Sequence, residues 1–276
     1  MLYLVPTPIG NLGDLSDRIR QALAEADFIA AEDTRVTMKL LRHLDLNRPL
    51  VSYHEHNKRI AGPKILARLQ AGETCALVTD AGTPAISDPG EDLVKLCIDA
   101  GVIVTALPGP CALITALCIS GLPTARFTFE GFLPTAAKDR RERLEQLLAE
   151  QRTMIFYEAP HRLRETLRDL AEAFGPNRPI ALCRELTKLH EEALRLRLGE
   201  AVTYYEENEP RGEYVLVLGG APEAVHSKEV TLEEALTMVR QQLDAGKRKK
   251  EAVRAVSELT GFPRNALYDA VLNLED

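Results

Sequence analysis

Residues 75–90 read CALVTDAGTPAISDPG, and they give the clearest indication of the architecture of the chain. The apolar run at 75–79 predicts a short buried strand, and the glycines and prolines that follow it predict a loop. Helical periodicity then begins at Glu91 and extends to residue 100. A buried strand that passes through a loop into a helix is typical of a parallel sheet covered by helices on both faces.

The segments on either side repeat this order of strand and helix. Further strands are predicted over 2–5, 28–31, 50–52 and 102–106, and helices over 17–26, 36–43 and 58–70. Residues 111–119 are apolar on every side, which predicts a buried helix. The N-terminal part of the chain is therefore predicted to be an α/β domain with a mostly parallel sheet.

A second α/β segment follows Gly121-Leu122-Pro123-Thr124, which is typical of a domain boundary. Its predicted strands are 127–133, 153–157, 180–184, 193–198 and 214–218, and its predicted helices are 140–150 and 163–174. Arg195-Leu196-Arg197-Leu198 alternates polar and apolar side chains, so this strand should have one face in water and lie in an antiparallel part of the sheet. The second sheet is therefore predicted to be mixed.

Gly219-Gly220-Ala221-Pro222 is a second segment typical of a domain boundary. The remainder of the chain is predicted to be a small helical appendage. Its helices are expected over 231–243, 249–259 and 264–272, and the small residues and glycine of 255–261 suggest a helix-turn-helix. The predicted domains are residues 1–121, 122–220 and 223–276.

Composition restricts the class of protein. The chain has 276 residues, 45% of them apolar, and no run approaches the roughly 20 apolar residues that cross a bilayer. Pro6 and Pro8 interrupt the short apolar start, which argues against a signal peptide. The five cysteines stand singly, which favours a reduced, cytoplasmic protein without a metal site. The net charge is −7, so any nucleic acid would have to bind a local basic patch.

Three strand ends of the first sheet carry unusual loops, at 6–13, 80–90 and 107–112. Ligands of open α/β sheets bind outside the carboxyl ends of the strands. Glycine allows close backbone approach there and proline fixes the path of the chain, so these loops predict a stiff binding surface. Neither G-x-G-x-x-G after the first strand nor a Walker phosphate loop is present. A cofactor without phosphates is therefore favoured over NAD, FAD or ATP.

The chain also contains several longer motifs. They are Pro8-Ile9-Gly10-Asn11, Ala31-Glu32-Asp33-Thr34-Arg35, the 80–90 loop, Pro108-Gly109-Pro110, Tyr157-Glu158-Ala159-Pro160-His161-Arg162, Arg184-Glu185-Leu186-Thr187-Lys188 and Gly212-Glu213-Tyr214. Together these motifs resemble the tetrapyrrole-methylase superfamily, and within it the branch of ribosomal RNA small subunit methyltransferases I, the cytidine-2′-O-methyltransferases. The resemblance spans about residues 1–220 in order, and a helical tail is also typical of the bacterial members.

This resemblance implies a homodimer with a two-domain fold and S-adenosylmethionine in the cleft between the domains. It also implies 2′-O-methylation of a cytidine ribose in the decoding region of small-subunit rRNA, so the partner would be that RNA or the 30S subunit. Tetrapyrrole-modifying relatives carry Gly-Asp-Pro where this chain has Asp80-Ala81-Gly82, which argues against a corrin or porphyrin substrate. The alternatives are a tetrapyrrole or a modified histidine as acceptor, or a cofactor-sensing or ribosome-assembly binding module.

The cofactor contacts implied by the resemblance come from both domains. They are Pro8, Gly10, Asp80, Ala81, Gly82, Thr83, Ile86, Cys111, Ala112, Tyr157, Glu158, Glu185, Leu186, Gly212 and Glu213. Much of this binding should involve backbone atoms. Asp80 is a candidate acceptor for the ammonium group of the cofactor, and equally a residue that caps its own turn.

Catalytic candidates are Asp33, Arg35 and His161. A carboxylate and a guanidinium at a strand end suit a general base and a ribose or phosphate contact. Asp33 could instead cap the helix that follows, with Arg35 paired to a carboxylate. His54-Glu55-His56 is interpreted as a polar loop, because residues i and i+2 of a strand face opposite ways and would not share a metal.

RNA contacts are expected on two basic segments. Residues 240–264 contain seven basic and three acidic side chains, centred on Lys247, Arg248, Lys249 and Lys250 and including Arg254. A second, weaker stripe combines Lys138, Arg140, Arg141 and Arg143 with interspersed acids. Both could also be ordinary solvated helix surface.

Overall fold

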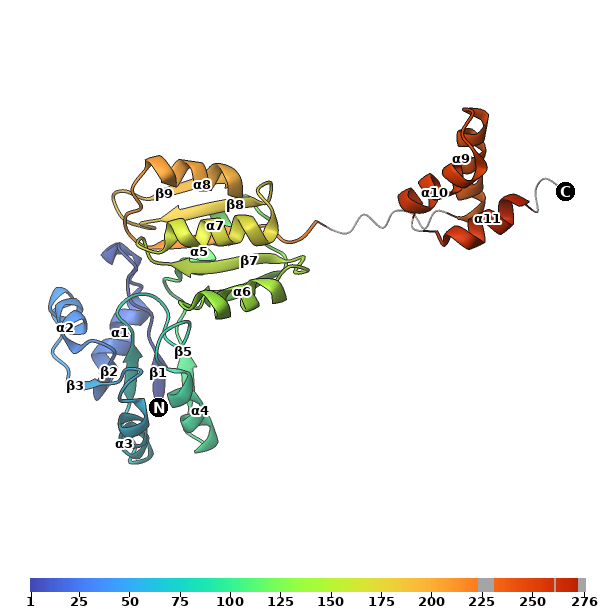
Figure 1. The fold of residues 1–276 in the computed structure, drawn as a ribbon. Coiled ribbons are helices and arrows are strands. Elements are labelled where there is room, and N and C mark those ends of the chain that lie inside the picture. Colours follow the sequence, from blue (N-terminus) through green and yellow to red (C-terminus); the bar gives the residue numbers. More distant parts are fainter. Residues whose placement is uncertain (223–230, 261, 273–276) are drawn as a thin grey trace. The chain divides into compact units, whose positions relative to one another are not determined.

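The computed structural model describes residues 1–222, 231–260 and 262–272. The chain forms two compact units, Met1–Gly220 and Ala221–Asp276 (Figure 1). Both predicted α/β segments lie in the first unit, and the boundary at residue 121 stays a prediction. Part of the predicted third domain, residues 223–230, lies outside the described residues.

The first sheet contains five short strands in the order β3-β2-β4-β1-β5, all parallel. They are β1 (Leu2–Leu4), β2 (Phe28–Ala31), β3 (Leu50–Ser52), β4 (Cys75–Val78) and β5 (Val104–Ala106). Helices α1 (Asp17–Glu25) and α2 (Thr34–His43) cover one face, and α3 (Lys58–Gln70) and α4 (Glu91–Asp99) cover the other (Figure 1). A short 3₁₀ helix, η1 (Leu12–Asp14), precedes α1. The predicted parallel sheet is confirmed.

The second sheet is mixed, as predicted, with the order β6-β7-β10-β8-β9. Its strands are β6 (Phe127–Phe132), β7 (Thr153–Glu158), β8 (Pro179–Arg184), β9 (Glu192–Arg197) and β10 (Tyr214–Leu218). Only the β6–β7 pairing is parallel within this sheet. Arg195 and Arg197 on the edge strand β9 are exposed, so the predicted wet face and antiparallel pairing are confirmed.

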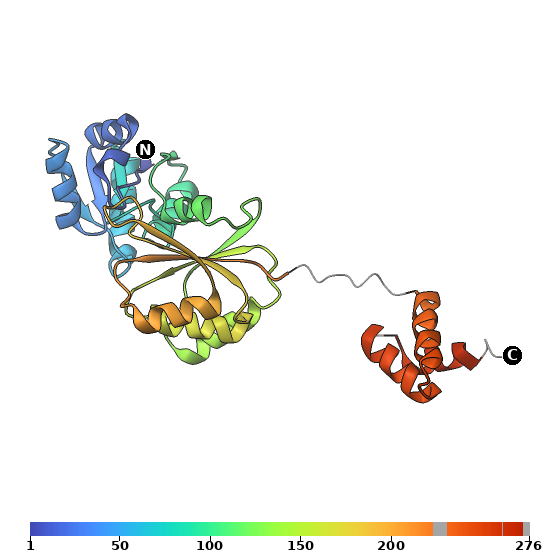
Figure 2. The same ribbon diagram turned by 90° about the horizontal axis from the view of Figure 1, so that it is seen from above.

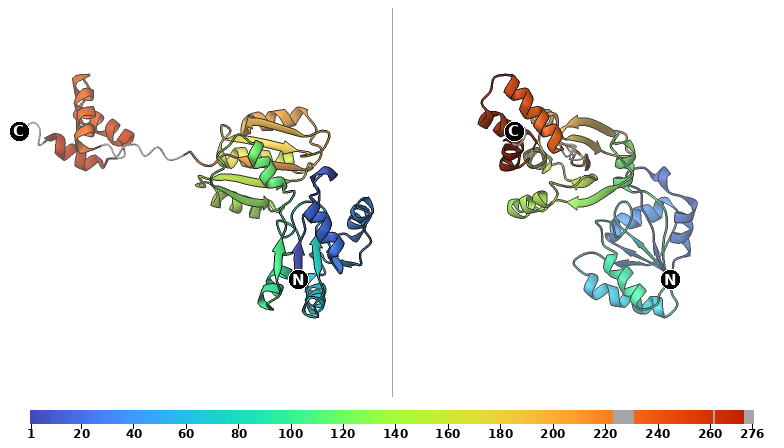
Figure 3. Two further views of the ribbon diagram at one scale, coloured as in Figure 1. Left: turned by 180° about the vertical axis from the view of Figure 1, so that it is seen from behind. Right: turned by 90° about the vertical axis from the view of Figure 1, so that its right-hand side faces the viewer.

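Helices α6 (Ala137–Gln146), α7 (Leu163–Phe174) and α8 (Leu198–Glu207) cover one face of the second sheet (Figure 2). Helix α5 (Ala112–Ile119) packs on the opposite face (Figure 3). The prediction that α5 is buried on every side is wrong. Leu113, Ala116 and Leu117 are buried, but 43% of Ile114 is exposed, because the sheet meets only one side of the helix.

Helix α8 is absent from the sequence-based prediction, which assigned no element between residues 198 and 214. The alternation of β9 leads directly into Leu198, the first residue of α8, without an intervening turn. The backbone N–H of Arg197 donates to Glu200 at 2.7 Å and fixes the start of the helix. Leu198, Ala201 and Tyr205 are buried at helical spacing, so the amphipathic signal was present.

The predicted basic stripe on α6 is wrong at Arg140, whereas Lys138 and Arg141 are exposed. Arg140 is 3% exposed and pairs with Glu165 and Asp169, while Arg143 pairs with Glu130. The Arg140 guanidinium donates to carbonyl and carboxylate groups of its own fold. It is therefore not free to bind phosphate.

The second unit is a small helical body, which confirms the predicted appendage. It consists of α9 (Leu232–Asp244), α10 (Lys249–Thr260) and α11 (Arg264–Leu272), packed around a small apolar core. Thr231 and Glu234 form a reciprocal cap at the start of α9. The turn predicted at 255–261 falls partly outside the described residues. Among the residues the structure describes, no helix is long and apolar enough to span a membrane.

Candidate functional site

The three unusual loops of the first sheet lie side by side because β4, β1 and β5 are neighbours in the strand order. Thr7 and Gly82 exchange two backbone hydrogen bonds, of 2.9 and 3.0 Å, between the loops after β1 and β4. The hydroxyl of Thr83 donates to the carbonyl of Pro110 at 2.8 Å and links the loops after β4 and β5. The three loops therefore form one cross-linked surface.

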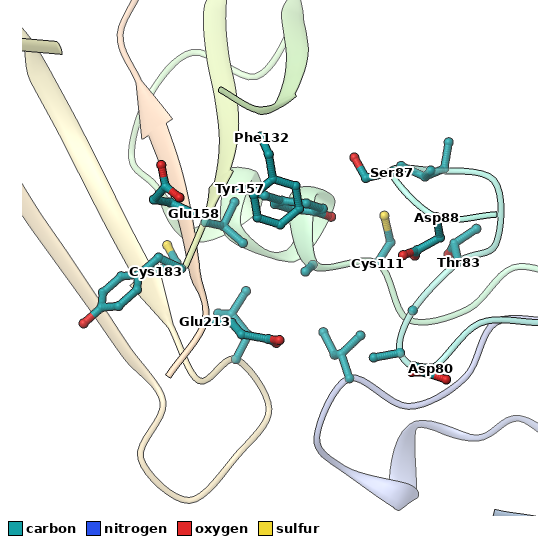
Figure 4. A pocket seen from close by; sticks show the side chains of 18 of the residues that line it. Asp80, Thr83, Ser87, Asp88, Cys111, Phe132, Tyr157, Glu158, Cys183 and Glu213 are labelled. Carbon is teal, nitrogen blue, oxygen red and sulfur yellow. The ribbon is translucent and has the colours of Figure 1, made fainter. Parts of the chain in front are cut away.

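The second sheet presents a matching edge. Strands β7 and β8 end there, and the antiparallel β10 begins there, so Glu158, Glu185 and Glu213 come together. The backbone N–H of Glu185 donates to the carbonyl of Glu213 at 3.4 Å. These chain segments face the cross-linked loops of the first sheet across a cavity (Figure 4).

This cavity has a volume of about 310 Å³, within the range of small-ligand sites. Twelve of the fifteen residues predicted to bind a cofactor line it: Asp80, Ala81, Gly82, Thr83, Ile86, Cys111, Ala112, Tyr157, Glu158, Glu185, Leu186 and Glu213. Pro8, Gly10 and Gly212 are not in the wall itself. A methyl group on Gly10 would collide with Lys188, and one on Gly212 with Glu185, so both glycines allow the loops to approach.

Ten wall residues were not selected from the sequence: Ile9, Glu32, Ser87, Asp88, Phe132, Ala159, Cys183, Lys188, Tyr214 and Val215. Most of them neighbour a predicted residue, so strand alternation next to the recognised motifs could have found them. Phe132 gave no such signal. It follows an irregularity of β6 between Phe129 and Gly131, which shifts the register and changes the direction of the side chains.

Backbone strain is concentrated in the wall of the cavity. Among the described residues, five non-glycine residues have positive φ, and four of them belong to two wall loops: Ala85, Ser87, Glu185 and Thr187. Each such residue costs about 1–3 kcal/mol and persists only where its surroundings impose the conformation. This concentration marks the cavity as the functional site.

The side chains of the wall give it an acidic side and an apolar side. Tyr157 packs edge-to-face against Phe129 and Phe132, with ring centroids 5.0 and 5.6 Å apart. Burial raises the pKa of Tyr157, which keeps the phenol neutral. Cys111 precedes α5 and lines the cavity as a free thiol, as the sequence suggested.

Two of the acidic residues are neutralised within the protein. Glu158 accepts hydrogen bonds from Thr166 and from the N–H of Ala159, and lies 3.6 Å from Arg162. Glu185 pairs with Lys188 at 2.9 Å, and that hydrogen bond lowers its pKa.

Three other acidic residues, Glu32, Asp80 and Asp88, concentrate negative charge at the first sheet. The N–H of Asp80 donates to Glu32 at 3.3 Å, and Asp80 accepts from the N–H of Asp33 at 3.1 Å. Asp80 therefore links two loops, beyond the two roles considered from the sequence. Burial is the main cause that raises the pKa of Glu32. The pKa of Asp88 is raised to about 7, first by burial and then by repulsion from Glu32, Asp80 and Glu213.

The three catalytic candidates lie outside the wall. Asp33 caps α2, accepting from the N–H of Arg35 at 2.8 Å, and pairs with the Arg35 guanidinium at 2.6 Å. These hydrogen bonds lower the pKa of Asp33 to about 2, which makes it a poor proton acceptor at neutral pH. The Arg35 side chain is 86% exposed near the mouth. His161 is exposed at the start of the β7–α7 connection.

The cavity suits a ligand of particular chemistry. Carboxylates on one side favour a cation and disfavour phosphate, while the aromatic and aliphatic wall suits an apolar ring. Backbone groups of the loops can supply hydrogen bonds to polar edges of the ligand. No group of three or more potential metal ligands is present in the described part of the chain.

Fold and site together define a two-sheet α/β protein. The cavity between its sheets has an acidic wall that disfavours a ligand with phosphate groups. The family model of tetrapyrrole (corrin/porphyrin) methylases matches residues 1–202. Two similar proteins are the ribosomal RNA small subunit methyltransferases I of Synechocystis sp., 49% identical over 100% of this chain and 98% of the relative, and of Escherichia coli O157:H7, 44% identical over 98% and 94%. The chain belongs to the tetrapyrrole methylases and, within them, to the ribosomal RNA small subunit methyltransferase I family.

A solved structure shares the fold. Uroporphyrin-III C-methyltransferase from Thermus thermophilus, complexed with S-adenosyl homocysteine, superposes with a TM-score of 0.56 and 19% identity, over 79% of this chain and 96% of that chain.

Proposed function

We propose that the protein transfers a methyl group from S-adenosylmethionine to the 2′-hydroxyl of a cytidine ribose in the decoding region of small-subunit (16S) ribosomal RNA. The observation that carries this proposal is the cavity between the two sheets, in a chain about half identical over its full length to rRNA methyltransferases. We also propose that it acts in the cytoplasm, on naked RNA or on the 30S subunit, because its substrate belongs to the ribosome.

The residues present fit this cofactor. S-adenosylmethionine carries positive charge on its sulfonium and ammonium groups and has no phosphate, which matches the carboxylates of the wall. We propose that Asp80 to Thr83, Ile86, Cys111 and Ala112 hold it from the first sheet, with Pro8 and Gly10 shaping their loop. The second sheet adds Tyr157, Glu158, Glu185, Leu186 and Glu213, with Gly212 allowing the approach of Glu185.

The cofactor supplies a methyl group with a good leaving group, so the protein must align the hydroxyl, exclude competing water and remove a proton. The cross-linked loops provide a rigid wall for this alignment, which in well-oriented systems lowers a barrier by about 7–11 kcal/mol. Arg35 is proposed to contact a ribose or phosphate at the mouth, held there by Asp33, and His161 to contact the substrate from the β7–α7 connection.

The surface next to the mouth favours RNA over a tetrapyrrole. Helix α2 carries exposed Arg35, Lys39, Arg42 and His43 and contains no acidic residue. Their spacing of three to four residues puts them on one side of the helix, which starts at the cavity mouth. In a protein of net charge −7 this is a local basic surface of the kind that binds a phosphate backbone.

This surface can be tested with the double variant Lys39→Ala/Arg42→Ala. We expect RNA affinity to fall about tenfold and the salt dependence of binding to become shallower, because phosphate contacts release counterions. S-adenosylmethionine affinity should not change. The control is Lys64→Ala/Lys95→Ala, which removes two exposed charges from the helices that cover the other face of the sheet. Equal RNA affinity for both double variants would exclude α2 as a contact.

The helical unit is proposed as a second RNA contact. Lys247, Arg248, Lys250 and Arg254 are exposed and Lys249 is half-buried. Deleting residues 223–276 should weaken RNA binding about tenfold or more and leave cofactor affinity unchanged, because the cavity is built from residues 9–215. Filter binding and calorimetry measure the two affinities. If the truncated protein binds RNA as tightly as the full chain, the unit has another role.

A homodimer is also proposed, on the resemblance to the family. The exposed apolar face of α5, with Ile114, is a surface that a second copy of this chain could cover. Light scattering of the full chain measures the oligomeric state, and a monomer at micromolar concentration contradicts this part of the proposal.

The proposed reaction is tested by giving the protein labelled S-adenosylmethionine with naked 16S rRNA, 30S subunits and a porphyrinogen. Label is expected in RNA, at a nuclease-resistant 2′-O-methylcytidine. Label in the porphyrinogen alone would assign the cavity to a tetrapyrrole acceptor. Cofactor binding without transfer to any acceptor would favour a binding module.

A further inference from the structure

One carboxyl group of the cavity differs from the others in its surroundings. Six carboxyl groups line the wall: Glu32, Asp80, Asp88, Glu158, Glu185 and Glu213. Four of these take part in the hydrogen bonds and ion pairs described above. Within the described ranges, Asp88 and Glu213 have no side-chain hydrogen bond or ion pair, and Glu213 is exposed. Asp88 is thus the half-buried carboxyl group of the wall that has no side-chain hydrogen bond and no ion pair.

The charged groups that act on Asp88 are acidic, and Lys188 of the same wall is paired with Glu185. Glu32, Asp80 and Glu213 repel the negative charge of Asp88. That charge also contributes to the raised pKa of Tyr157, which keeps the phenol neutral. Cys111 also lines the cavity, on the same side as Asp88 in Figure 4. Burial and repulsion together raise the pKa of Asp88 to about 7, close to the pH at which a proton acceptor is most effective.

The loop that carries Asp88 is held in one conformation. Ala85 and Ser87 both have positive φ, at 68° and 61°, and Gly90 closes the segment. A methyl group on Gly90 would lie 3.1 Å from the backbone nitrogen of Ala85, so the loop packs tightly on itself. A carboxyl group on a rigid loop can be aimed at a reacting atom without a further loss of entropy.

We propose that Asp88 is the catalytic base, which receives the proton of the acceptor hydroxyl, and that its ionisation is coupled to the positive charge bound in the cavity. The proposal rests on the proposed function and names the proton acceptor of that reaction.

The charges balance through the reaction. In the free protein near pH 7, Asp88 is partly protonated, and a sulfonium in the same cavity favours its ionised form by attraction. The hydroxyl oxygen then forms a bond to the methyl carbon while the carbon–sulfur bond breaks and its electron pair remains on sulfur. The hydroxyl proton passes to Asp88 and from there to water. Cation and carboxylate are neutralised in the same step, so no unpaired charge is left in the half-buried site.

The first test is the rate of single-turnover methylation. Asp88→Asn should lower this rate by about 10²–10⁴-fold, the usual contribution of a general base, with cofactor affinity within about threefold of wild type. Asp88→Glu should retain part of the rate. The matched control is Asp99→Asn, at the exposed end of α4, which should behave as wild type. Full activity of Asp88→Asn would overturn the proposal.

The second test needs no RNA, so it also distinguishes failure of this proposal from failure of the proposed function. Calorimetric titration at pH 7 in buffers of different ionisation enthalpy counts the protons released on binding. S-adenosylmethionine should displace about half a proton from the wild type, because a group with a pKa near 7 is half protonated there. S-adenosylhomocysteine, which lacks the sulfonium charge, should displace fewer. Equal proton release from wild type and Asp88→Asn would contradict the coupling.

The third test is thermal stability, which also shows that the variant folds. A pKa raised by folding stabilises the folded protein at low pH, and this contribution is lost as the pH rises towards 7. Asparagine cannot ionise, so the melting temperature of Asp88→Asn relative to wild type should increase between pH 5 and 7, by about 3 °C, and level off above. If the difference in melting temperature between Asp88→Asn and wild type does not change with pH, Asp88 is already ionised at pH 5. That result would overturn the proposal.

Discussion

Gly82→Arg is expected to abolish cofactor binding, with a loss of at least about 100-fold in affinity, or about 2.8 kcal/mol. Gly82 follows β4 and has φ of +88°, a conformation that side chains other than glycine rarely adopt. A Cβ atom there would lie 3.4 Å from Ile9 and 3.8 Å from the carbonyl of Pro110. An arginine side chain would therefore start between the loops and extend through the cavity.

Two further variants separate the causes of this loss. Gly82→Ala adds the strained conformation without filling the cavity, so its affinity should lie between those of wild type and Gly82→Arg. Gly175→Arg is the matched control, because Gly175 has φ of +85° and a Cβ atom at that position would meet nothing within 4 Å. Calorimetry with S-adenosylhomocysteine measures all three. Tight binding by Gly82→Arg would place the ligand elsewhere.

Arg140→Ala is expected to destabilise the first unit by about 2–4 kcal/mol. The side chain is only 4% exposed, pairs with Asp169 and Glu165, and donates to the carbonyl of Thr135 at 3.1 Å. Removing it leaves an acidic pair and a carbonyl group without their donor. RNA affinity of the folded variant should stay unchanged, since this guanidinium is not available to phosphate.

The neighbouring residue provides the comparison. Arg141→Ala removes an exposed guanidinium from the same helix and should change the free energy of unfolding by less than about 0.5 kcal/mol. Urea denaturation of both variants measures the difference. Equal stability of the two would mean that the buried ion pairs of Arg140 contribute nothing net to the fold.

The sequence predicted the two sheets because their strands differ in pattern. The central runs of the first sheet are apolar throughout, as in Phe28–Ala31, where every residue is buried. The edge strand β9 alternates instead, and that alternation indicated its antiparallel pairing. Helix α8 was missed because it starts where the strand ends, so no turn residue separates the two periodicities.

The candidate site was predictable where it depends on backbone. Glycine and proline mark the positions where a loop must turn or where its backbone must approach another group closely. These residues identified the loops after β1, β4 and β5. Side-chain partners left no such record. That Arg140 is buried while Arg141 is exposed, or that Asp88 has no partner, depends on groups distant in the sequence.

The position of β10 has a consequence for the order in which the protein becomes functional. This strand is the last of the second sheet to be synthesised, yet it lies between β7 and β8. A growing chain that ends before residue 213 cannot join those two strands, and it also lacks Glu213 to Val215 of the cavity wall. Almost the entire first unit must therefore be translated before the new protein can bind its cofactor. Each copy of an enzyme that modifies ribosomes thus depends on a ribosome completing that unit.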